Sequence, residues 1–160
     1  MKTKVIALVV LFSFGFYVFQ SCQKSHHKAV IGLLMDDFAT ERWAKDTTFF
    51  INKVNELGGK VICRIANQNP LKQLEQAKEL IEKKVDVLVI VPADLELAGQ
   101  IVKAAGAAHI KVISYDRLIL NSNLDYFISF DNVKVGELQA DYVLNRLGKG
   151  NVALIGGPLS

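Results

Sequence analysis

The chain has 160 residues, with 19 Lys and Arg against 16 Asp and Glu and a formal net charge of +3. That length accommodates one compact domain, or one domain and part of a second. Apolar residues make up 51% of the chain, partly because of its N-terminus. The basic residues alternate with acidic ones and form no cluster with aromatic residues, which argues against a nucleic-acid partner.

The first 21 residues have the pattern of a secretory signal. A short positive segment precedes an almost wholly apolar run, residues 5–19, which is too short for a comfortable membrane span of about 20 residues. Cys22 then follows the small Ser21, as in a bacterial lipoprotein cleavage site, although Phe19 stands where that pattern prefers Leu. We therefore expect a lipoprotein signal peptide over residues 1–21 and a lipidated Cys22 that anchors the chain to the membrane. An ordinary signal peptide with an accidental cysteine is the alternative.

Residues 22–28 form a short polar tether after the signal. The histidine pair His26 and His27 lies in it with no third ligand nearby, which indicates solvated side chains rather than a metal site. The second cysteine is Cys63. With Cys22 lipidated no internal disulfide is available, so we expect Cys63 to be a small buried residue of a strand. We expect no metal and no cofactor.

Six short runs rich in Val and Ile follow the tether. They are continuous rather than alternating, which is typical of parallel strands buried on both faces. The runs are AVIGLLM (29–35), KVICRIA (60–66), VDVLVIV (85–91), KVISY (111–115), DYFISF (125–130) and NVALIG (151–156).

Helical patterns separate most of these runs. Residues 40–57 have apolar side chains at helical spacing and end at two glycines, and Asn69 before Pro70 predicts the cap and first turn of a second helix. The stripes expected to face the sheet are Thr47, Phe50, Ile51, Val54 and Leu57 in the first helix, and Leu71, Leu74, Ala77, Ile81 and Val85 in the second.

Two further helices are expected after the third and fifth runs. Asp94 predicts the cap of one that continues to about residue 108, and Asn132 the cap of another that runs to Leu147 before Gly148. Strands alternating with helices predict an α/β fold, a doubly wound parallel sheet with helices on both faces. Right-handed crossovers place the C-terminal ends of all strands on one edge, where such sheets bind ligands.

Polar side chains collect at that expected edge. Asp and Asn there are partly explained by helix capping, but Arg42, Trp43 and Arg117 are not. A carboxylate such as Asp116 accepts two O–H bonds, a guanidinium donates several, and Trp offers a flat apolar face, a combination that suits a neutral sugar. Two plainer interpretations stay open, namely a strand-end ion pair of Asp116 with Arg117, and core packing of Trp43.

Enzyme motifs are absent from the sequence. The segment after the first run, LLMDDFA, contains no glycine for a phosphate loop, and there is no G-x-S-x-G elbow and no His, Cys or Asp set with ligand spacing. Asp36 and Asp37 would suit an acidic receiver domain. That alternative places a phosphoacceptor where Pro92 stands, and it conflicts with export. We therefore expect a binding protein and not an enzyme.

Four segments carry a family resemblance: IGLLMDDFATERWAKD, VDVLVIVPAD, KVISYDRLI and FISFDNVKVGELQA. In order and spacing they resemble the periplasmic sugar-binding proteins of ABC importers, of type I fold, and most closely the D-xylose-binding branch. YDR also occurs in ribose, galactose and arabinose relatives, whereas DD…ERW is more specific to the xylose branch. The resemblance implies that Arg42, Asp116 and Arg117 bond sugar hydroxyls and that Trp43 stacks on the ring.

The resemblance also implies a domain division. Residues 29–131 would form an N-terminal sugar-binding lobe, and residues 132–160 the hinge exit and the incomplete start of a second, similar lobe. The expected function is a lipid-anchored periplasmic solute-binding protein that delivers a pentose, D-xylose, to an ABC permease in the membrane, here with about half of the family's length. Alternatives are a sugar-sensing domain of a membrane signalling system and a repressor's effector domain. The repressor alternative needs an N-terminal helix-turn-helix where this chain has a signal peptide.

Overall fold

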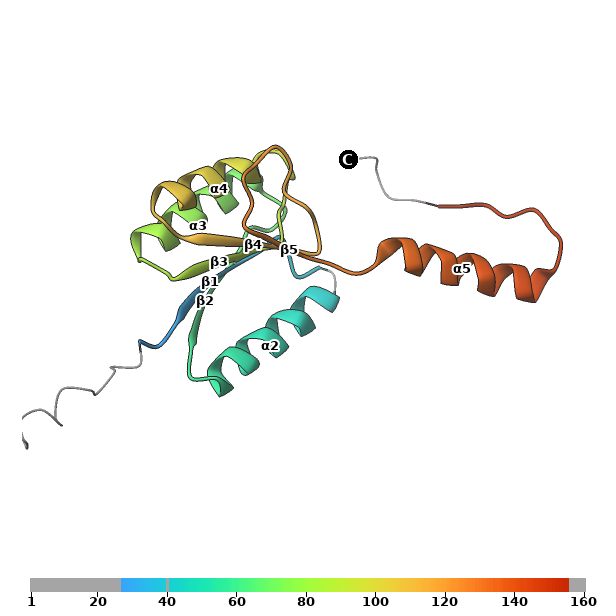
Figure 1. Cartoon of the computed structure of the whole chain (residues 1–160), viewed down its shortest axis with the longest axis horizontal. Helices are drawn as coiled ribbons and strands as arrows, with labels where there is room; N and C mark the ends of the chain where they lie inside the picture. The colour runs from blue at the N-terminus through green and yellow to red at the C-terminus, as the bar shows by residue number, and fades with distance from the viewer. Residues whose placement is uncertain (1–26, 40, 156–160) are drawn as a thin grey trace, which may run out of the picture.

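The computed structural model describes residues 27–39 and 41–155. The signal peptide expected over residues 1–21 and the lipidation expected at Cys22 lie outside the described residues. Figure 1 shows a sheet covered by helices, with one further helix standing away from it.

Five parallel strands form a single sheet in the order β2-β1-β3-β4-β5. The strands are β1 (Val30–Met35), β2 (Lys60–Ile65), β3 (Val87–Ile90), β4 (Lys111–Tyr115) and β5 (Tyr126–Ile128). Each coincides with one of the predicted apolar runs, so the predicted parallel sheet is confirmed. Because every neighbouring pair is parallel, all carboxyl ends lie at one edge.

The prediction of a sixth strand over residues 151–156 is wrong for the residues that the structure describes, 151–155. Residues 151–155 have no strand structure, and the side chains of Leu154 and Ile155 are 95% exposed. An apolar run becomes a strand only where a neighbouring strand supplies hydrogen bonds and a covered face. No described strand lies beside this segment.

Helices cover both faces of the sheet, as the doubly wound fold predicts. Helices α3 (Pro70–Glu82) and α4 (Ala98–Ala107) pack on one face, and α2 (Glu41–Glu56) packs on the other (Figure 1). The larger buried cluster joins α3 and α4 to the sheet through residues such as Leu34, Leu80 and Ile90. A smaller cluster around Trp43 and Met35 lies on the α2 face.

The cap predicted for α3 is confirmed, and those predicted for the other two helices need correction. The Asn69 side chain accepts a hydrogen bond from the Lys72 backbone N–H, with Pro70 in the first turn. Asp94 instead accepts from the Leu97 N–H at 2.6 Å and so stabilises a separate turn, after which α4 begins at Ala98.

At the last helix, α5 (Asn132–Leu147), the cap is Asp131 rather than Asn132. The Asp131 carboxylate accepts a hydrogen bond from the Lys134 N–H at 2.9 Å, the position that a capping oxygen reaches. Gly148 ends the helix with a φ of 66°, as predicted.

The inward stripes of the first two helices are only partly as predicted. Leu71 is 65% exposed, whereas Leu80 and Gln73, absent from the predicted stripe, are fully buried. Gln73 is buried because its amide donates to the Val91 carbonyl at 2.9 Å and its oxygen accepts from the Ala93 N–H at 3.0 Å. Leu57, predicted to face the sheet, follows the end of α2 and is 74% exposed.

Cys63 lies on the edge strand β2 and is a free, half-buried thiol rather than a fully buried one. An edge strand has a neighbour on one side only, which explains its incomplete cover. Partial burial raises the pKa of this thiol above its ordinary value.

The start of β1 is tied to the loop before β3. The Asp86 carboxylate accepts from the Val30 N–H at 2.6 Å, and its other oxygen lies 2.8 Å from His27 Nε2. His27 is therefore paired, although its side chain is exposed as expected. Within residues 27–39 and 41–155, no group of three His, Cys, Asp or Glu side chains could hold a metal ion.

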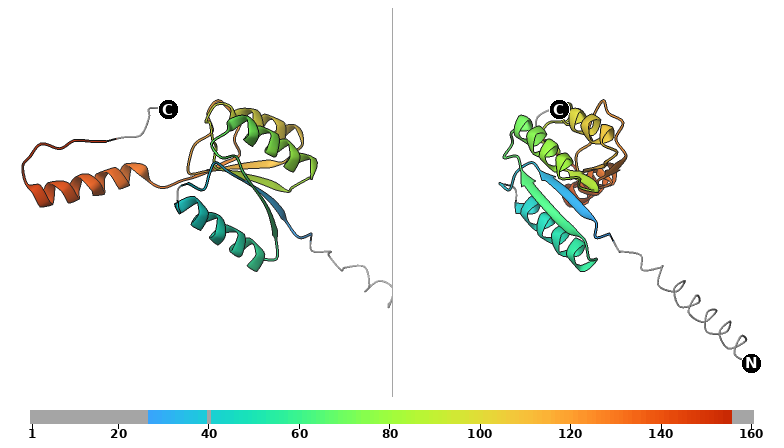
Figure 2. Two further views of the ribbon diagram at one scale, coloured as in Figure 1. Left: turned by 180° about the vertical axis from the view of Figure 1, so that it is seen from behind. Right: turned by 90° about the vertical axis from the view of Figure 1, so that its left-hand side faces the viewer.

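Helix α5 stands apart from the sheet in the left view of Figure 2. None of its residues is buried, and its apolar side chains Val133, Leu138 and Tyr142 are more than half exposed. No helix in the described part of the chain is both long and apolar enough to cross a membrane.

Candidate ligand-binding site

Three of the predicted site residues meet at the carboxyl edge of the sheet. Arg42 stands in the first turn of α2, and Asp116 and Arg117 follow β4 directly. Arg42 Nη2 donates to Asp116 Oδ1 at 2.6 Å, which joins residues 74 positions apart. Asp116 has a φ of 66°, a left-handed conformation that Asp tolerates, and its N–H donates to the Ile128 carbonyl at 2.8 Å. Strand β5 thereby fixes the carboxylate in position.

Arg117 does not pair with its neighbour Asp116 but with the carboxylate of Asp36. Its Nη1 donates to Asp36 Oδ2 at 2.7 Å and to the Pro92 carbonyl at 3.0 Å. The short ion pairs at this edge are therefore Arg42 with Asp116 and Arg117 with Asp36. The simple strand-end pair of Asp116 with Arg117, left open by the sequence, is not what forms.

Trp43 is a core residue in this structure. Its side chain is only 4% exposed, and it packs with Met35 and Val91 and meets Tyr115 edge-on at a centroid distance of 6.2 Å. The Arg42 guanidinium carbon lies 4.1 Å from the centre of the Trp43 ring. Stacking of a ligand on this ring, which the family resemblance implies, requires Arg42 to move aside.

Asp46 on α2 and Tyr115 on β4 support this arrangement. Tyr115 donates its hydroxyl hydrogen to Asp46 Oδ2 at 2.8 Å, and that same oxygen lies 4.0 Å from Arg42 Nε. Burial, followed by the hydrogen bond to Asp46, raises the pKa of Tyr115 to about 12, so the phenol remains a neutral donor. Partial burial lowers the pKa of Arg42, but the hydrogen bond and charge of Asp116 outweigh that effect and raise it above its ordinary value.

Sequence reasoning left two carboxylates of this edge out of the site. Asp36 is 5% exposed, and its Oδ1 is buried without a hydrogen-bond partner among the described residues. Asp37 accepts from Gln68 Nε2 at 2.7 Å and from the Ala39 N–H at 3.0 Å. Their place directly after β1 was the available signal, but an acidic residue there also suits other α/β proteins. The unsatisfied Asp36 oxygen is itself buried, so the carboxylate serves the site by holding Arg117.

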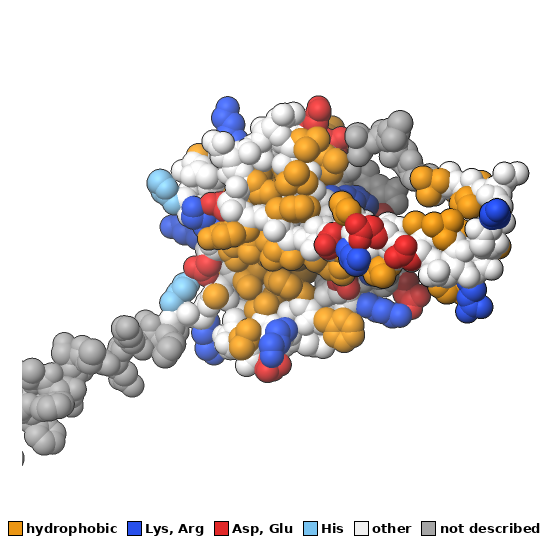
Figure 3. Space-filling model, turned by 45° about the vertical axis from the view of Figure 1, so that its right-hand side comes forward, with side chains coloured by type: hydrophobic (Ala, Val, Ile, Leu, Met, Phe, Trp, Pro, Cys, Tyr) orange, Lys and Arg blue, Asp and Glu red, His pale blue; other side chains and the backbone are white. Residues whose placement is uncertain are grey.

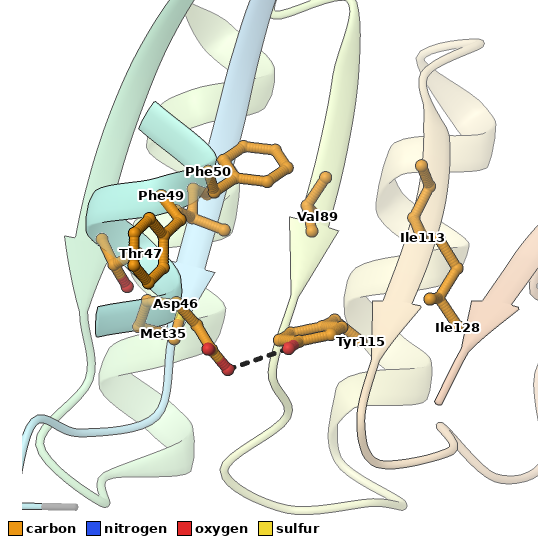
Figure 4. A pocket seen from close by; sticks show the side chains of 10 residues that line it. Met35, Asp46, Thr47, Phe49, Phe50, Val89, Ile113, Tyr115 and Ile128 are labelled. Atoms are coloured by element: carbon orange, nitrogen blue, oxygen red, sulfur yellow. Dashed lines mark hydrogen bonds between the residues drawn. The ribbon is translucent and has the colours of Figure 1, made fainter. Parts of the chain in front are cut away.

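A separate cavity of about 370 Å³ lies between α2 and the sheet. Figure 4 shows Phe50, Val89, Ile113 and Ile128 around it, with the Asp46–Tyr115 hydrogen bond at one end. Its lining is mostly apolar, and Figure 3 shows hydrophobic side chains gathered across the body of the molecule. A hydroxyl-rich ligand would find few polar partners there, so the polar carboxyl edge remains the better candidate.

Comparisons with known sequences point to one family. The model of the periplasmic binding protein domain matches residues 31–160. The chain is 45% identical over 127 residues to a D-xylose-binding periplasmic protein of Haemophilus influenzae, which covers 79% of this chain and 38% of that protein. It is 44% identical over 134 residues to the D-xylose-binding periplasmic protein of Escherichia coli K12, covering 83% and 41%. The chain thus spans less than half the length of these relatives.

Solved structures show the same fold. A solute-binding protein of an ABC transporter from Clostridium phytofermentans, with bound β-D-glucose, superposes with a TM-score of 0.71 at 29% identity over 74% of this chain and 37% of that one. The fructose-binding periplasmic domain of a hybrid two-component system superposes with a TM-score of 0.64 at 25% identity over 75% and 40%.

Proposed function

Because this chain belongs to the periplasmic binding protein domain family, we propose that it binds a monosaccharide, D-xylose, for import by an ABC permease. The observation that carries the proposal is the meeting of Arg42, Asp116, Arg117 and Asp36 at the carboxyl edge of the sheet. The relatives named for D-xylose support the choice of sugar. Binding and release, without catalysis, would be the whole of its chemistry.

In the proposed complex the sugar competes with protein partners for charged groups. Asp116 would exchange its bond to Arg42 for two sugar hydroxyls, and Arg42, released from Asp116, would donate to another hydroxyl. The described hydrogen bonds of Arg117 use only its Nη1, so its other nitrogens are available as donors. Trp43 would stack on the ring once Arg42 has left it.

We propose that residues 29–131 are the N-terminal lobe and residues 132–160 the hinge exit and the start of a second lobe. Helix α5 and the described residues after it, 148–155, lack buried side chains, which fits elements that pack on a different sheet. The second lobe would close over the sugar and exclude water from the polar contacts described above.

A sensing role is the second candidate function. The similarity to a fructose-binding periplasmic domain of a hybrid two-component system supports it, because that domain has the same fold in a signalling protein. The two roles differ in the partner, a permease or a membrane kinase. Copurification from solubilised membranes with one or the other distinguishes them.

Sugar binding is expected to depend on Asp116. Asp116→Ala removes charge-assisted hydrogen bonds and should weaken D-xylose binding by about 1.5–3 kcal/mol. NMR titration of the chain with D-xylose, D-ribose and D-glucose measures this even at millimolar affinity. Asp94→Ala is the matched control, since Asp94 also follows a strand but bonds only backbone N–H groups of its own turn. Equal affinities for D-xylose in both variants would show that the site is misplaced.

We also propose that the protein is a lipoprotein anchored to the membrane in the periplasm, because Cys22 follows Ser21 at the end of an apolar run. Mass spectrometry of detergent-extracted protein should find a mature chain that begins at an acylated Cys22. Cys22→Ala should move the protein from the membrane fraction to the soluble periplasmic fraction. A mature N-terminus at any other residue would refute the anchor.

A further inference from the structure

We propose that Asp46 is a positioning residue that holds Arg42 over Trp43 and so governs access to the tryptophan ring. The proposal begins with the anchoring of Asp46 itself. Tyr115 on β4 donates to Asp46 Oδ2 at 2.8 Å across 69 positions of sequence, which fixes this carboxylate of α2 against the sheet (Figure 4). A half-buried aspartate on a helix would otherwise be free to change rotamer.

The anchored Asp46 lies one helical turn after Arg42, on the same face of α2. Its Oδ2 is 4.0 Å from Arg42 Nε, while Arg42 Nη2 donates to Asp116 at 2.6 Å. Two carboxylates, one from α2 and one from the end of β4, therefore face the same edge of one guanidinium, Asp116 through a hydrogen bond and Asp46 through a longer ion-pair contact. Both contacts favour the observed position of the group, with its central carbon 4.1 Å from the centre of the Trp43 ring.

The position of Arg42 decides whether Trp43 can be reached. The ring is buried on its other sides by Met35, Val91 and the edge-on Tyr115, and only 4% of the residue is exposed. Arg117 also lies beside the ring, with its guanidinium carbon 5.8 Å from the ring centre, but it is held by the buried Asp36 and by the Pro92 carbonyl. Arg42, with 41% of its side chain accessible, is bonded to the more exposed Asp116. It is therefore the group that can move without opening the core.

Asp46 would also receive Arg42 during ligand binding, a step that rests on the proposed sugar-binding function. When a sugar takes over Asp116, Arg42 loses its hydrogen-bonded partner, and a guanidinium without an anion nearby is less stable. Asp46 offers an anion one turn away, already oriented by Tyr115. Without Asp46, the displaced Arg42 guanidinium would have no fixed carboxylate of α2 within reach.

Acrylamide quenching of tryptophan fluorescence tests the proposal directly, because Trp43 is the only tryptophan in the chain. Asp46→Asn keeps an oxygen for the Tyr115 hydroxyl but removes the charge beside Arg42. We expect the population with an uncovered ring to rise about two- to fivefold, the range for loss of a partly exposed ion pair. Asp46→Glu should restore most of the protection, because a glutamate at the same position also reaches Arg42.

Glu41→Gln is the matched control, since it neutralises another acid of α2 whose ion pair is with Lys45. It should leave the quenching of Trp43 unchanged. Equal quenching in the wild type and Asp46→Asn would overturn the proposal, as would failure of Asp46→Glu to protect the ring when both variants unfold at the same urea concentration as the wild type.

Sugar titration of the same variants tests the second step. Asp46→Asn should weaken D-xylose binding by about two- to fivefold, because losing the anion that receives Arg42 outweighs the easier uncovering of the ring, and Glu41→Gln should not change the affinity. Unchanged binding in Asp46→Asn would overturn the role of Asp46 in receiving Arg42. If no sugar binds the wild type, the proposed function fails, and the quenching measurement still decides whether Asp46 holds Arg42 in place.

Discussion

Replacing Arg117 with Met is expected to destabilise the fold by about 2–4 kcal/mol, because it leaves the Asp36 carboxylate buried without a cation. The Asp36 side chain is 7% exposed, and the bond from Arg117 Nη1 to its Oδ2 is 2.7 Å long. The other oxygen of Asp36 has no partner among the described residues to share the charge. The Arg117 side chain is 39% exposed, so water can reach the gap and reduce the cost somewhat.

Urea unfolding of a small set of variants measures this effect and isolates its cause. The double variant Asp36→Asn with Arg117→Met should recover part of the loss, since the buried charge is then gone. Arg64→Met is the matched control, because Arg64 pairs with a more exposed carboxylate, Glu79, and its loss should change stability little. If Arg117→Met and Arg64→Met have the same small effect, the Arg117–Asp36 pair does not stabilise the fold.

The expected cost also explains how one arginine can serve both the fold and a ligand. One nitrogen of Arg117 holds the end of β1 to the loop after β3, through Asp36 and the Pro92 carbonyl. The guanidinium is therefore fixed before a ligand arrives, and its remaining donors are preorganised. A site residue held in this way needs little reordering on binding.

The sheet could be predicted from sequence because its signals are local. Each of the first five apolar runs contains a strand, and the Asn69–Pro70 pair marked the start of α3 correctly. The run over residues 151–156 has the same composition, but a strand also needs a neighbour, and composition does not report one. Composition also could not decide whether Asp131 or Asn132 caps α5. Both residue types cap helices, and only the backbone geometry distinguishes the two positions.

The pairing within the candidate site could not be predicted in the same way. The sequence placed Arg42, Asp116 and Arg117 at one edge, because parallel strands bring their carboxyl ends together. Which carboxylate each arginine binds depends on side-chain directions across 74 and 81 positions, which no local pattern encodes. The cover of Arg42 over Trp43 likewise depends on packing between α2 and β4.

Leu71 and Leu80 of α3 show what helical spacing alone can miss. A stripe drawn through Leu71 predicts that it faces the sheet, but the buried face runs through Gln73, Ala77 and Leu80. The predicted and observed faces differ because Gln73 is polar, and a count of apolar side chains therefore leaves it out. Its side-chain amide is nevertheless buried, because it bonds backbone groups of Val91 and Ala93. Leu80 instead occupies the space above Gly32 of β1, where an added Cβ would lie 2.9 Å from its Cδ1.

Leu80→Ala is therefore expected to cost about 2–5 kcal/mol of unfolding free energy, because it leaves a cavity over a glycine that has no side chain to fill it. Leu71→Ala makes the same chemical change in the same helix and should cost no more than about 0.5 kcal/mol, since Leu71 is 65% exposed. Helix propensity changes equally in both variants, so their difference reports burial alone. Urea unfolding at one pH provides both values. A larger loss for Leu71→Ala than for Leu80→Ala would reverse the orientation of α3 and, with it, the packing that supports β1 and the carboxylate at its end.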